Sequence, residues 1–412
     1  MKILSASWVI TCDANSTIIK DGAIVYDKTI IEVATKEYIQ EKYPNICIEE
    51  LGLNSVLMPG LINSHVHLEF SSNTTTLKYG NFMSWLNSVI SSREVLVEKA
   101  TKKLISQKLN KMKKTGTTTI GAISSYGLDM EACLNSDLNT VFFSEVIGSK
   151  PDMVDTLFSD FKARLNSAKL NLSEKFIPAI AIHSPYSVHP FLLRETLKLA
   201  CEDNLSVSSH FLESPEEFEW LHKDEGGFLE FFKNFLGQEK AVTKPMEFLE
   251  QFKNVKTLSF THCVEASDND LDKIKNLNAI VNHCPTSNRL LNNTKLDLEK
   301  LIQREIPFSI GTDGLSSNNS LSIFDELRNA LMVHESKNVI DLSNILIKAA
   351  TKNGSDALGL NKGELSKNKD SDIICLTLPD MIEDENDLCM NIILHTKYVN
   401  RTIIGGKNVW ND

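Results

Sequence analysis

Eight short apolar runs alternate with polar loops and amphipathic segments along the middle of this 412-residue chain. The runs cover residues 61–67, 117–123, 140–146, 177–183, 205–210, 255–262, 279–283 and 308–313. Segments with helical character lie between them, at residues 94–114, 155–170, 190–203 and 268–276. Eight β/α alternations over roughly 250 residues are typical of a (β/α)₈ barrel of the TIM type, whose active site lies at the carboxyl ends of the strands.

The two ends of the chain differ from this middle. Residues 1–55 and 364–412 hold short β-like pieces separated by turns, and neither end alone has enough strands for a stable sheet. We expect the two ends to pair into one small β-sandwich domain beside a barrel of residues 56–363. The length of the chain, which exceeds that of a usual single domain, agrees with this division.

Composition excludes several classes of partner. The chain has 43 Lys and Arg against 54 Asp and Glu, and a net charge of −11 argues against a nucleic-acid backbone. No apolar run is long enough to span a bilayer, and the first residues lack the apolar stretch of a signal peptide. The eight cysteines are scattered without a Cys-x-x-Cys pair, which is typical of reduced thiols. We therefore expect a cytoplasmic protein without a membrane partner.

Four residues at the ends of the apolar runs could bind a metal. His65 and His67 close one run, and residues two apart in a strand point to the same side of the sheet. His210 and Asp313 close two other runs. Three imidazoles and one carboxylate form a site for a divalent transition metal that keeps a position open for water. The pattern indicates a metal-dependent hydrolytic enzyme.

Five motifs resemble those of the amidohydrolase superfamily, and more narrowly its chlorohydrolase/cytosine-deaminase-like branch of amine-releasing enzymes. They are PGLINSHVH at 59–67, SHFLE at 209–213, THC at 261–263, NHCPTSN at 282–288 and GTDGLSSNNS at 311–320. A lone His-x-His is a weak signal, but five motifs in order along the chain are specific. The phrase HVHLEFS at 65–71, followed by YGNF and WL, is further similar to the aminodeoxyfutalosine deaminases. Their relatives deaminate S-adenosylhomocysteine, 5′-methylthioadenosine or adenosine.

The resemblance implies that His65, His67, His210 and Asp313 hold one divalent ion. Zinc is the default for this ligand set, and iron or manganese could bind it too. Superfamily members with two metals carry a carboxylated lysine at the end of the fourth strand. The run at 177–183 has no lysine, which favours a single ion.

Three residues are implied in the chemistry. By resemblance, Glu213 is the proton shuttle that protonates the ring nitrogen beside the attacked carbon and later the leaving amine. A surface acid is the alternative for Glu213, but no other glutamate nearby has the His-x-x-Glu spacing from His210. Asp313 would also accept the proton of the attacking water, and His262 would orient the hydroxide and stabilise the tetrahedral intermediate.

Further residues are candidates for binding the substrate. His183 ends the fourth run, where related purine deaminases contact a ring nitrogen. Glu69 could bind ribose hydroxyls, and Glu145 could bind a ribose hydroxyl or pair with a barrel cation. A substrate that carries a carboxylate would need an arginine, for which Arg289 and Arg93 are the candidates.

Two stretches could form the pocket walls. Residues 70–93 hold Tyr79, Phe82 and Trp85 after the His-x-His motif. Residues 226–235 hold four phenylalanines at i, i+3, i+4 and i+7, which is one face of a helix. That helix could either pack on the barrel rim or form an apolar lid over the substrate.

We therefore predict a metal-dependent deaminase of a 5′-substituted adenine nucleoside, with aminodeoxyfutalosine in menaquinone biosynthesis as the preferred substrate. The alternatives are a deaminase of S-adenosylhomocysteine, methylthioadenosine or adenosine, and a hydrolase of guanine, a pterin or an s-triazine. A catalytically dead barrel would lack metal ligands, yet every expected ligand is present. The expected partner is a small nucleoside, and analogy with relatives suggests a homodimer.

Overall fold

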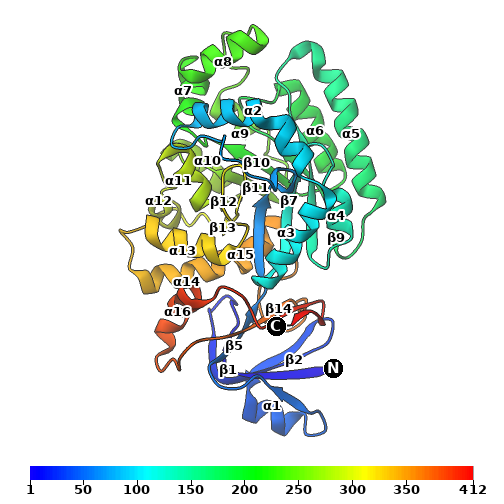
Figure 1. The fold of residues 1–412 in the computed structure, drawn as a ribbon, viewed down its shortest axis with the longest axis vertical. Helices are drawn as coiled ribbons and strands as arrows, with labels where there is room; N and C mark the ends of the chain where they lie inside the picture. Colours follow the sequence, from blue (N-terminus) through cyan, green and yellow to red (C-terminus); the bar gives the residue numbers. More distant parts are fainter. Residues whose placement is uncertain (412) are drawn as a thin grey trace.

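The computed structural model describes residues 1–411, which form a parallel barrel and a separate sheet built from both chain ends (Figure 1). The barrel strands are β6 (Leu61–Val66), β7 (Thr117–Ser124), β8 (Asn139–Val146), β9 (Phe176–Ile182), β10 (Val207–Phe211), β11 (Leu258–His262), β12 (Ile280–His283) and β13 (Phe308–Ile310). They pair in chain order, each parallel to the next. The backbone N–H groups of Thr312 and Asp313 donate to the carbonyl of His65, at 3.1 and 3.0 Å, and bring the last strand back to the first. The predicted (β/α)₈ barrel is confirmed.

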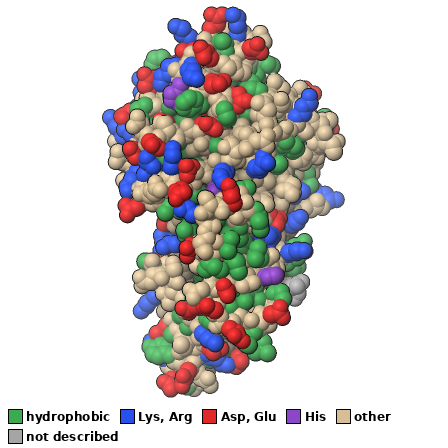
Figure 2. Space-filling view, turned by 90° about the vertical axis from the view of Figure 1, so that its left-hand side faces the viewer, with side chains coloured by type: hydrophobic (Ala, Val, Ile, Leu, Met, Phe, Trp, Pro, Cys, Tyr) green, Lys and Arg blue, Asp and Glu red, His purple; other side chains and the backbone are tan. Residues whose placement is uncertain are grey.

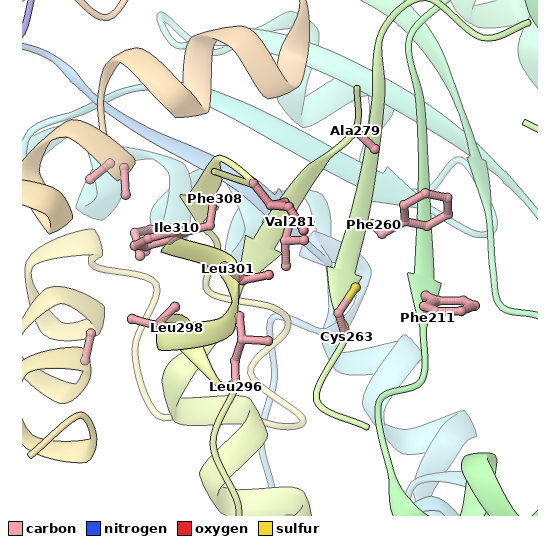
Figure 3. Close-up of a cluster of buried hydrophobic side chains, with 14 of the residues drawn as sticks. Phe211, Phe260, Cys263, Ala279, Val281, Leu296, Leu298, Leu301, Phe308 and Ile310 are labelled. Carbon is pink, nitrogen blue, oxygen red and sulfur yellow. The ribbon is translucent and has the colours of Figure 1, made fainter. Parts of the chain in front are cut away.

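Apolar side chains on the outer face of the strands pack against the surrounding helices. Figure 3 shows this arrangement around β11 to β13 and α12 (Leu298–Gln303), where Val281, Phe308 and Ile310 lie near Leu298 and Leu301. In the same view Phe260 packs against Phe211 of β10. Strands covered in this way are almost entirely buried, as expected for a parallel sheet. The core therefore fixes the strands, and with them the positions at which they end.

Small polar side chains occupy the opposite face, toward the barrel interior. The hydroxyl of Ser309 contacts the hydroxyl of Ser64 at 2.9 Å and donates to Oδ1 of Asn282 at 2.7 Å. Asn282 donates to Ser259, whose hydroxyl donates to Ser208 at 3.0 Å. This chain of hydrogen bonds crosses five strands, and it satisfies groups that would otherwise be costly to bury.

The helices around the barrel follow the predicted alternation. They are α2 (Phe82–Lys99), α3 (Lys102–Lys114), α4 (Met130–Leu134), α5 (Val154–Leu170), α6 (Pro190–Glu202), α7 (Pro215–Lys223), α8 (Gly227–Leu236), α9 (Pro245–Glu250), α10 (Asp268–Asn276), α11 (Pro285–Asn292), α12, α13 (Ile323–Val333), α14 (Val339–Ala349) and α15 (Lys352–Leu358). One prediction is wrong, because residues 94–114 are not a single helix. The chain leaves the helix at Ala100, and Thr101 accepts a hydrogen bond from the N–H of Leu104 to begin α3.

The second sheet joins the two chain ends. Its order is β16 (Lys407–Asn411), β15 (Arg401–Ile404), β14 (Ile373–Thr377), β5 (Ser55–Pro59), β1 (Lys2–Ile10), β2 (Ile18–Tyr26) and β3 (Ile30–Thr35), with β4 (Ile48–Glu50) paired to β1. Strand β14 from the C-terminal part pairs antiparallel with β5, which in turn pairs with β1. Two helices accompany this sheet in the sequence, α1 (Lys36–Lys42) and α16 (Leu388–His395). The separate terminal domain is thus confirmed, whereas its division from the barrel at residues 55 and 364 stays a prediction.

The surface carries charges of both signs. Figure 2 shows acidic and basic side chains interspersed over one face of the molecule. Among residues 1–411, no helix combines the length and the apolar character needed to cross a membrane.

Candidate active site

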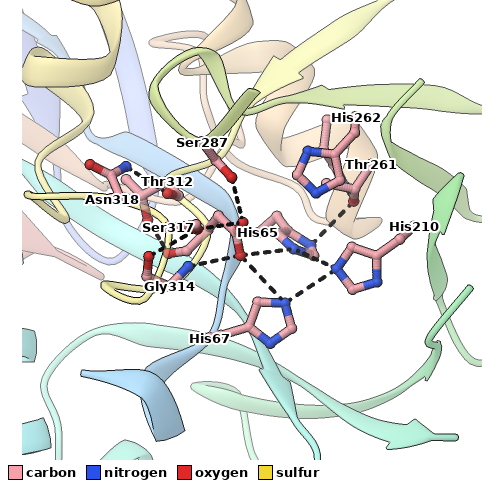
Figure 4. A network of polar contacts seen from close by, with 12 residues as sticks. His65, His67, His210, Thr261, His262, Ser287, Thr312, Gly314, Ser317 and Asn318 are labelled. Atoms are coloured by element: carbon pink, nitrogen blue, oxygen red, sulfur yellow. Dashed lines mark hydrogen bonds and ion pairs between the residues drawn. The ribbon is translucent and has the colours of Figure 1, made fainter. Parts of the chain in front are cut away.

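Four side chains converge at the carboxyl end of the barrel (Figure 4). Nε2 of His210 lies 3.2 Å from Nε2 of His65 and 3.3 Å from Nε2 of His67. Oδ1 of Asp313 lies 3.6 Å from Nε2 of His67 and 4.0 Å from Nε2 of His65. The structure therefore brings together all four residues that the sequence indicates as metal ligands, from the ends of β6, β10 and β13.

Hydrogen bonds from outside this cluster fix the orientation of the side chains. Nδ1 of His210 donates to the carbonyl of His183 at 2.6 Å, so its Nε2 presents a lone pair to the cluster. Nδ1 of His65 contacts the hydroxyl of Thr261 at 3.2 Å. The rings of His65 and His210 are thus held through Nδ1, while Nε2 of each faces the common centre.

Asp313 is held in the same way. Its Oδ2 accepts hydrogen bonds from the hydroxyls of Ser287 and Ser317, at 2.8 and 2.7 Å, and its Oδ1 accepts the N–H of Gly314. Burial alone would raise the pKa of this carboxyl. The nearby imidazoles, with His67 first, and the Ser317 hydroxyl outweigh burial and hold the pKa of Asp313 below its ordinary value. The side chain is therefore a carboxylate at neutral pH.

The backbone bends sharply where these strands end. Leu212, His262, Cys263 and Asp313 all have positive φ, at 46°, 74°, 52° and 58°. Residues other than glycine rarely adopt this left-handed conformation, and it costs about 1–3 kcal/mol each where it occurs. The clustering of such residues at the ends of three strands marks this region as the functional end of the barrel.

Glu213 and His262 form a second pair beside the cluster. Nε2 of His262 lies 3.4 Å from Oε1 of Glu213, and Nδ1 of His262 donates to Oδ1 of Asn288 at 2.8 Å. Burial raises the pKa of Glu213 well above its ordinary value, and the charge of Asp313 raises it further. Burial lowers the pKa of His262, against the opposing charge of Asp313. Burial therefore favours the protonated form of the Glu213 carboxyl and the neutral form of the His262 imidazole.

The backbone around Glu213 is fixed by two side chains that the sequence did not indicate. Glu217, on the first turn of α7, accepts the N–H of Glu213 at 2.8 Å and the N–H of Leu212 at 3.1 Å. Asn292 donates to the carbonyl of Glu213 at 2.9 Å. Glu217 is fully buried, although its acidic neighbours in the sequence suggest a surface position. The spacing Ser214-x-x-Glu217, a capping-box pattern, is the signal that could have identified it.

A cavity of about 520 Å³ opens above these groups. Its volume falls within the usual range for small-molecule sites. His67, His210, Glu213, His262 and Asp313 form part of its lining. The rest is a largely apolar wall that includes Phe70, Phe82, Trp85, Leu86, Val89, Met153, Leu157, Phe231, Phe232 and Leu236. The cavity can accept a ligand with a polar reactive end and an extended apolar part.

The two predicted wall segments meet at this cavity. Phe82 on α2 packs against Phe228 on α8, with ring centroids 5.9 Å apart. Phe231 and Phe232 line the cavity, whereas Phe235 is 60% exposed and points away from it. The α8 helix therefore combines both expected roles, rim packing and a lid wall. Tyr79 does not line the cavity.

Four of the six predicted substrate-binding residues line the cavity, namely His183, Trp85, Glu145 and Arg93. Nδ1 of His183 contacts the hydroxyl of Ser187 at 2.6 Å. Nε1 of Trp85 donates to the carbonyl of Ser316 at 2.8 Å, which fixes the indole on the wall.

The other two predicted residues lie elsewhere, which corrects the expectation for both. Glu69 accepts the N–H groups of Ser125, Tyr126 and Leu128, at distances from 2.7 to 3.1 Å, so it holds the loop after β7 rather than a sugar. Arg289 is exposed on α11 and donates to Asn293. A sequence shows that such residues follow strand ends, but not which way they point.

Comparison with known proteins agrees with this geometry. Residues 56–409 match the Amidohydrolase family. The chain is 46% identical over 391 residues to an aminodeoxyfutalosine deaminase of Nitratiruptor sp., covering 95% of this chain and 96% of the relative. It is 35% identical to an adenosine deaminase of Helicobacter pylori, covering 99% of each.

A solved structure of a deaminase is also similar to this chain over its whole length. The crystal structure of Helicobacter pylori aminofutalosine deaminase in complex with methylthio-coformycin matches with a TM-score of 0.94 and 33% identity, over 100% of both chains. The chain belongs to the amidohydrolase family.

Proposed function

We propose that this protein is a metal-dependent aminodeoxyfutalosine deaminase, which replaces the 6-amino group of the purine by oxygen and releases ammonia in menaquinone biosynthesis. The observation that carries this proposal is the convergence of His65, His67, His210 and Asp313, with Glu213 and His262 beside them at the cavity. The 46% identity to a deaminase of that name supports the choice of substrate.

The cluster fits a divalent ion. Nδ1 of His210 is a donor, so the Nε2 lone pair of this ring faces two further imidazole nitrogens at 3.2 and 3.3 Å. Lone pairs this close repel one another unless a cation or a proton lies between them. Burial lowers the pKa of both His65 and His210, which disfavours a proton between these nitrogen atoms and favours a metal cation. We propose one ion, held by His65, His67, His210 and Asp313, with zinc as the default because imidazole and carboxylate suit it.

Such an ion would lower the pKa of a bound water from about 15.7 towards about 7 and would so supply hydroxide as the nucleophile at neutral pH. The side chains perform the rest of the reaction. Glu213 begins with a proton on its carboxyl group and donates it to the ring nitrogen beside the attacked carbon, which makes that carbon electrophilic. Nε2 of His262, which lacks a proton, is placed to accept a hydrogen bond from the attacking hydroxyl. As the carbonyl forms, the hydroxyl of the intermediate would lose its proton to the Asp313 carboxylate. That proton would pass to the amine, whose bond to the ring carbon breaks as ammonia leaves.

His183 is proposed to hold the purine. Its Nδ1 is engaged by Ser187, and the ring lines the cavity beside His210, with ring centroids 5.2 Å apart. Burial keeps the pKa of His183 below its ordinary value, so the ring is neutral at neutral pH. A neutral imidazole can form one hydrogen bond with a purine nitrogen, which orients the base without adding charge.

A deaminase of adenosine or 5′-deoxyadenosine is the second candidate. It is favoured by the 35% identity to an adenosine deaminase and by relatives named 5′-deoxyadenosine deaminase at 28% identity. Both candidates use the same chemistry on the same base. They differ at the 5′ position of the ribose, far from the reacting carbon. The cytoplasmic location and the homodimer stay predictions.

A steady-state comparison tests the proposal. The zinc-loaded enzyme is assayed for ammonia release with aminodeoxyfutalosine, methylthioadenosine, S-adenosylhomocysteine, adenosine, 5′-deoxyadenosine and guanine. We expect the highest kcat/KM with aminodeoxyfutalosine and about one metal ion per chain. Equal values for aminodeoxyfutalosine and adenosine would remove the narrow assignment, and no ammonia from any nucleoside would remove the deaminase.

A further inference from the structure

Three neighbouring loops bring two cations and a tyrosine to one side of the cavity. Strands β6, β7 and β8 are consecutive in the barrel, so the segments that follow them lie side by side. Arg93 comes from α2 after β6, Tyr126 from the loop after β7, and Lys150 from the loop after β8. All three line the cavity. We call them the Arg93–Tyr126–Lys150 patch.

Both cations of the patch lack an acidic partner. The guanidinium of Arg93 donates to the hydroxyl of Tyr126 and lies over the tyrosine ring, 5.1 Å from its centroid. Within residues 1–411, no carboxylate lies within ion-pair distance of Arg93 or Lys150. Many cations elsewhere in this acidic chain are paired, such as Lys295 with Glu335 at 2.7 Å. Two unpaired cations at one cavity create a positive field that attracts an anion.

An unsatisfied acceptor lies on the same side of the cavity. Glu145, at the end of β8, is buried and accepts a hydrogen bond from the hydroxyl of Ser125 through Oε2. Its Oε1 is buried without a hydrogen-bond partner in the described chain. A buried acceptor left unpaired costs about 1–3 kcal/mol, so a ligand that brings a hydroxyl donor to this position is favoured.

Glu145 also links the patch to the metal cluster. Glu145, His183 and His210 each have one side-chain nitrogen or oxygen atom that could bind a ligand. These three atoms all lie within 4.8 Å of one another. The residues therefore form a continuous path along the cavity wall, from His210 through His183 and Glu145 to the Arg93–Tyr126–Lys150 patch. Apolar side chains such as Trp85 and Ile147 line the same cavity.

We propose that the nucleoside lies along this path, with a 5′ substituent that ends in a carboxylate bound between Arg93 and Lys150. The ribose hydroxyls donate to Glu145, and the purine reaches His183 and the metal cluster. The inference rests on the proposed deaminase function and adds to it the residues that select an anionic substrate. A guanidinium can bind a carboxylate through two parallel hydrogen bonds, and a lysine adds a mobile point charge.

The test compares an anionic with a neutral substrate. The variants Arg93→Met, Lys150→Met and the double variant are assayed with aminodeoxyfutalosine, which carries a carboxylate, and with 5′-deoxyadenosine, which is neutral. The ratio of the two kcat/KM values should fall about tenfold in each single variant and further in the double variant, as expected for charge-assisted hydrogen bonds at a partly exposed rim. Arg93→Lys should lose less of the ratio than Arg93→Met, because it keeps the charge.

Two controls isolate the effect. Arg194→Met and Lys198→Met remove cations from α6 that do not line the cavity, and they should leave the ratio unchanged. Glu145→Gln should lower kcat/KM for both substrates by a similar factor, because both carry ribose hydroxyls. Metal content and the unfolding temperature of each variant show whether it is folded and loaded.

The outcomes separate the inference from the function on which it rests. A double variant that is folded, metal-loaded and active, yet keeps the wild-type ratio, would overturn the inference and leave the deaminase in place. A fall in the ratio with Arg194→Met as large as with Arg93→Met would also overturn it, because the effect would then be one of net charge. A wild-type enzyme that releases no ammonia from any nucleoside would overturn both.

Discussion

Replacing Glu217 by glutamine should slow turnover without removing the metal or the substrate site. Glu217 touches neither of them, but both of its oxygens accept N–H groups from consecutive peptides, at Leu212 and Glu213. Glutamine keeps one acceptor and turns an NH₂ group toward the other N–H. The loop must then shift, and with it the carboxyl group that we propose as the proton shuttle.

The magnitude follows from two opposing effects on stability. The variant leaves one buried N–H group without an acceptor, which costs about 1–3 kcal/mol. Burial raises the pKa of Glu217 to about 8, from an ordinary value of 4.5. A folded-state pKa above the unfolded value means that stability falls as the pH rises from 4.5 to 8, by about 3 kcal/mol at pH 7. Glutamine carries no charge and avoids this cost, so the free energy of unfolding at pH 7 should change by less than about 2 kcal/mol.

The two effects offset each other in the free energy of unfolding, but nothing offsets the effect on kcat. Misplacement of a catalytic group by about 1 Å can cost about 10²-fold, so kcat should fall between about tenfold and a hundredfold. We expect KM to stay within about threefold, because the cavity wall and the metal ligands are unchanged. The assay is steady-state ammonia release over a pH series, with metal content and denaturant unfolding measured on the same samples.

Glu219→Gln is the matched control, because Glu219 lies on the same helix and makes no hydrogen bond to the loop after β10. Asn292→Ala removes the hydrogen bond to the carbonyl of Glu213 and should lower kcat in the same direction. A Glu217→Gln enzyme with wild-type kcat, full metal content and an unchanged pH profile would refute the positioning argument.

Three further predictions concern the cluster and the distant core. Glu213→Gln should lower kcat by about 10²–10⁴-fold while metal content stays at wild-type level, since its proton transfer is lost and no ligand is removed. Prolonged dialysis against a chelator should abolish ammonia release and lower the unfolding temperature, because an ion that binds only the folded chain stabilises that chain. Added zinc should restore both the activity and the unfolding temperature. An unfolding temperature that does not change on dialysis would contradict a bound ion. Burial, with the charge of Lys295, lowers the pKa of His334 to about 4. The unfolded chain therefore binds more protons than the folded chain between pH 6.5 and 4. The free energy of unfolding falls on acidification in that window, by about 2 kcal/mol at pH 5. In denaturant unfolding, His334→Asn should reduce this dependence of stability on pH.

The barrel and the metal cluster could be predicted because both depend on local pattern. Eight apolar runs are visible in the sequence, and each ends near a polar residue that the fold carries to the same rim. The spacing of His65 and His67 alone places both rings on one side of a strand. The prediction of one helix over 94–114 is wrong because α2 ends at Lys99 and Thr101 caps the start of a second helix, α3.

The residues that support the site could not be predicted in the same way. Asn288 and Ser287 lie on α11 and reach His262 and Asp313, which end other segments. Glu217 sits in an acidic run that is typical of a solvated helix face, yet it is buried against the loop after β10. Such contacts depend on how one loop packs against the next, and no local pattern encodes that.

The chain by itself determined the order of its strands, the type of chemistry at their ends and the ligand set for an ion, because periodicity and residue type act over a few neighbours. Only the tertiary structure decided which acids and arginines face the cavity. Glu69, Glu145 and Arg289 all lie near the ends of strands. Glu145 lines the cavity, but Glu69 is bound by backbone N–H groups of the loop after β7, and Arg289 is exposed to solvent. A side chain's direction is set by the free energy of all the contacts around it, and those contacts come from distant parts of the chain.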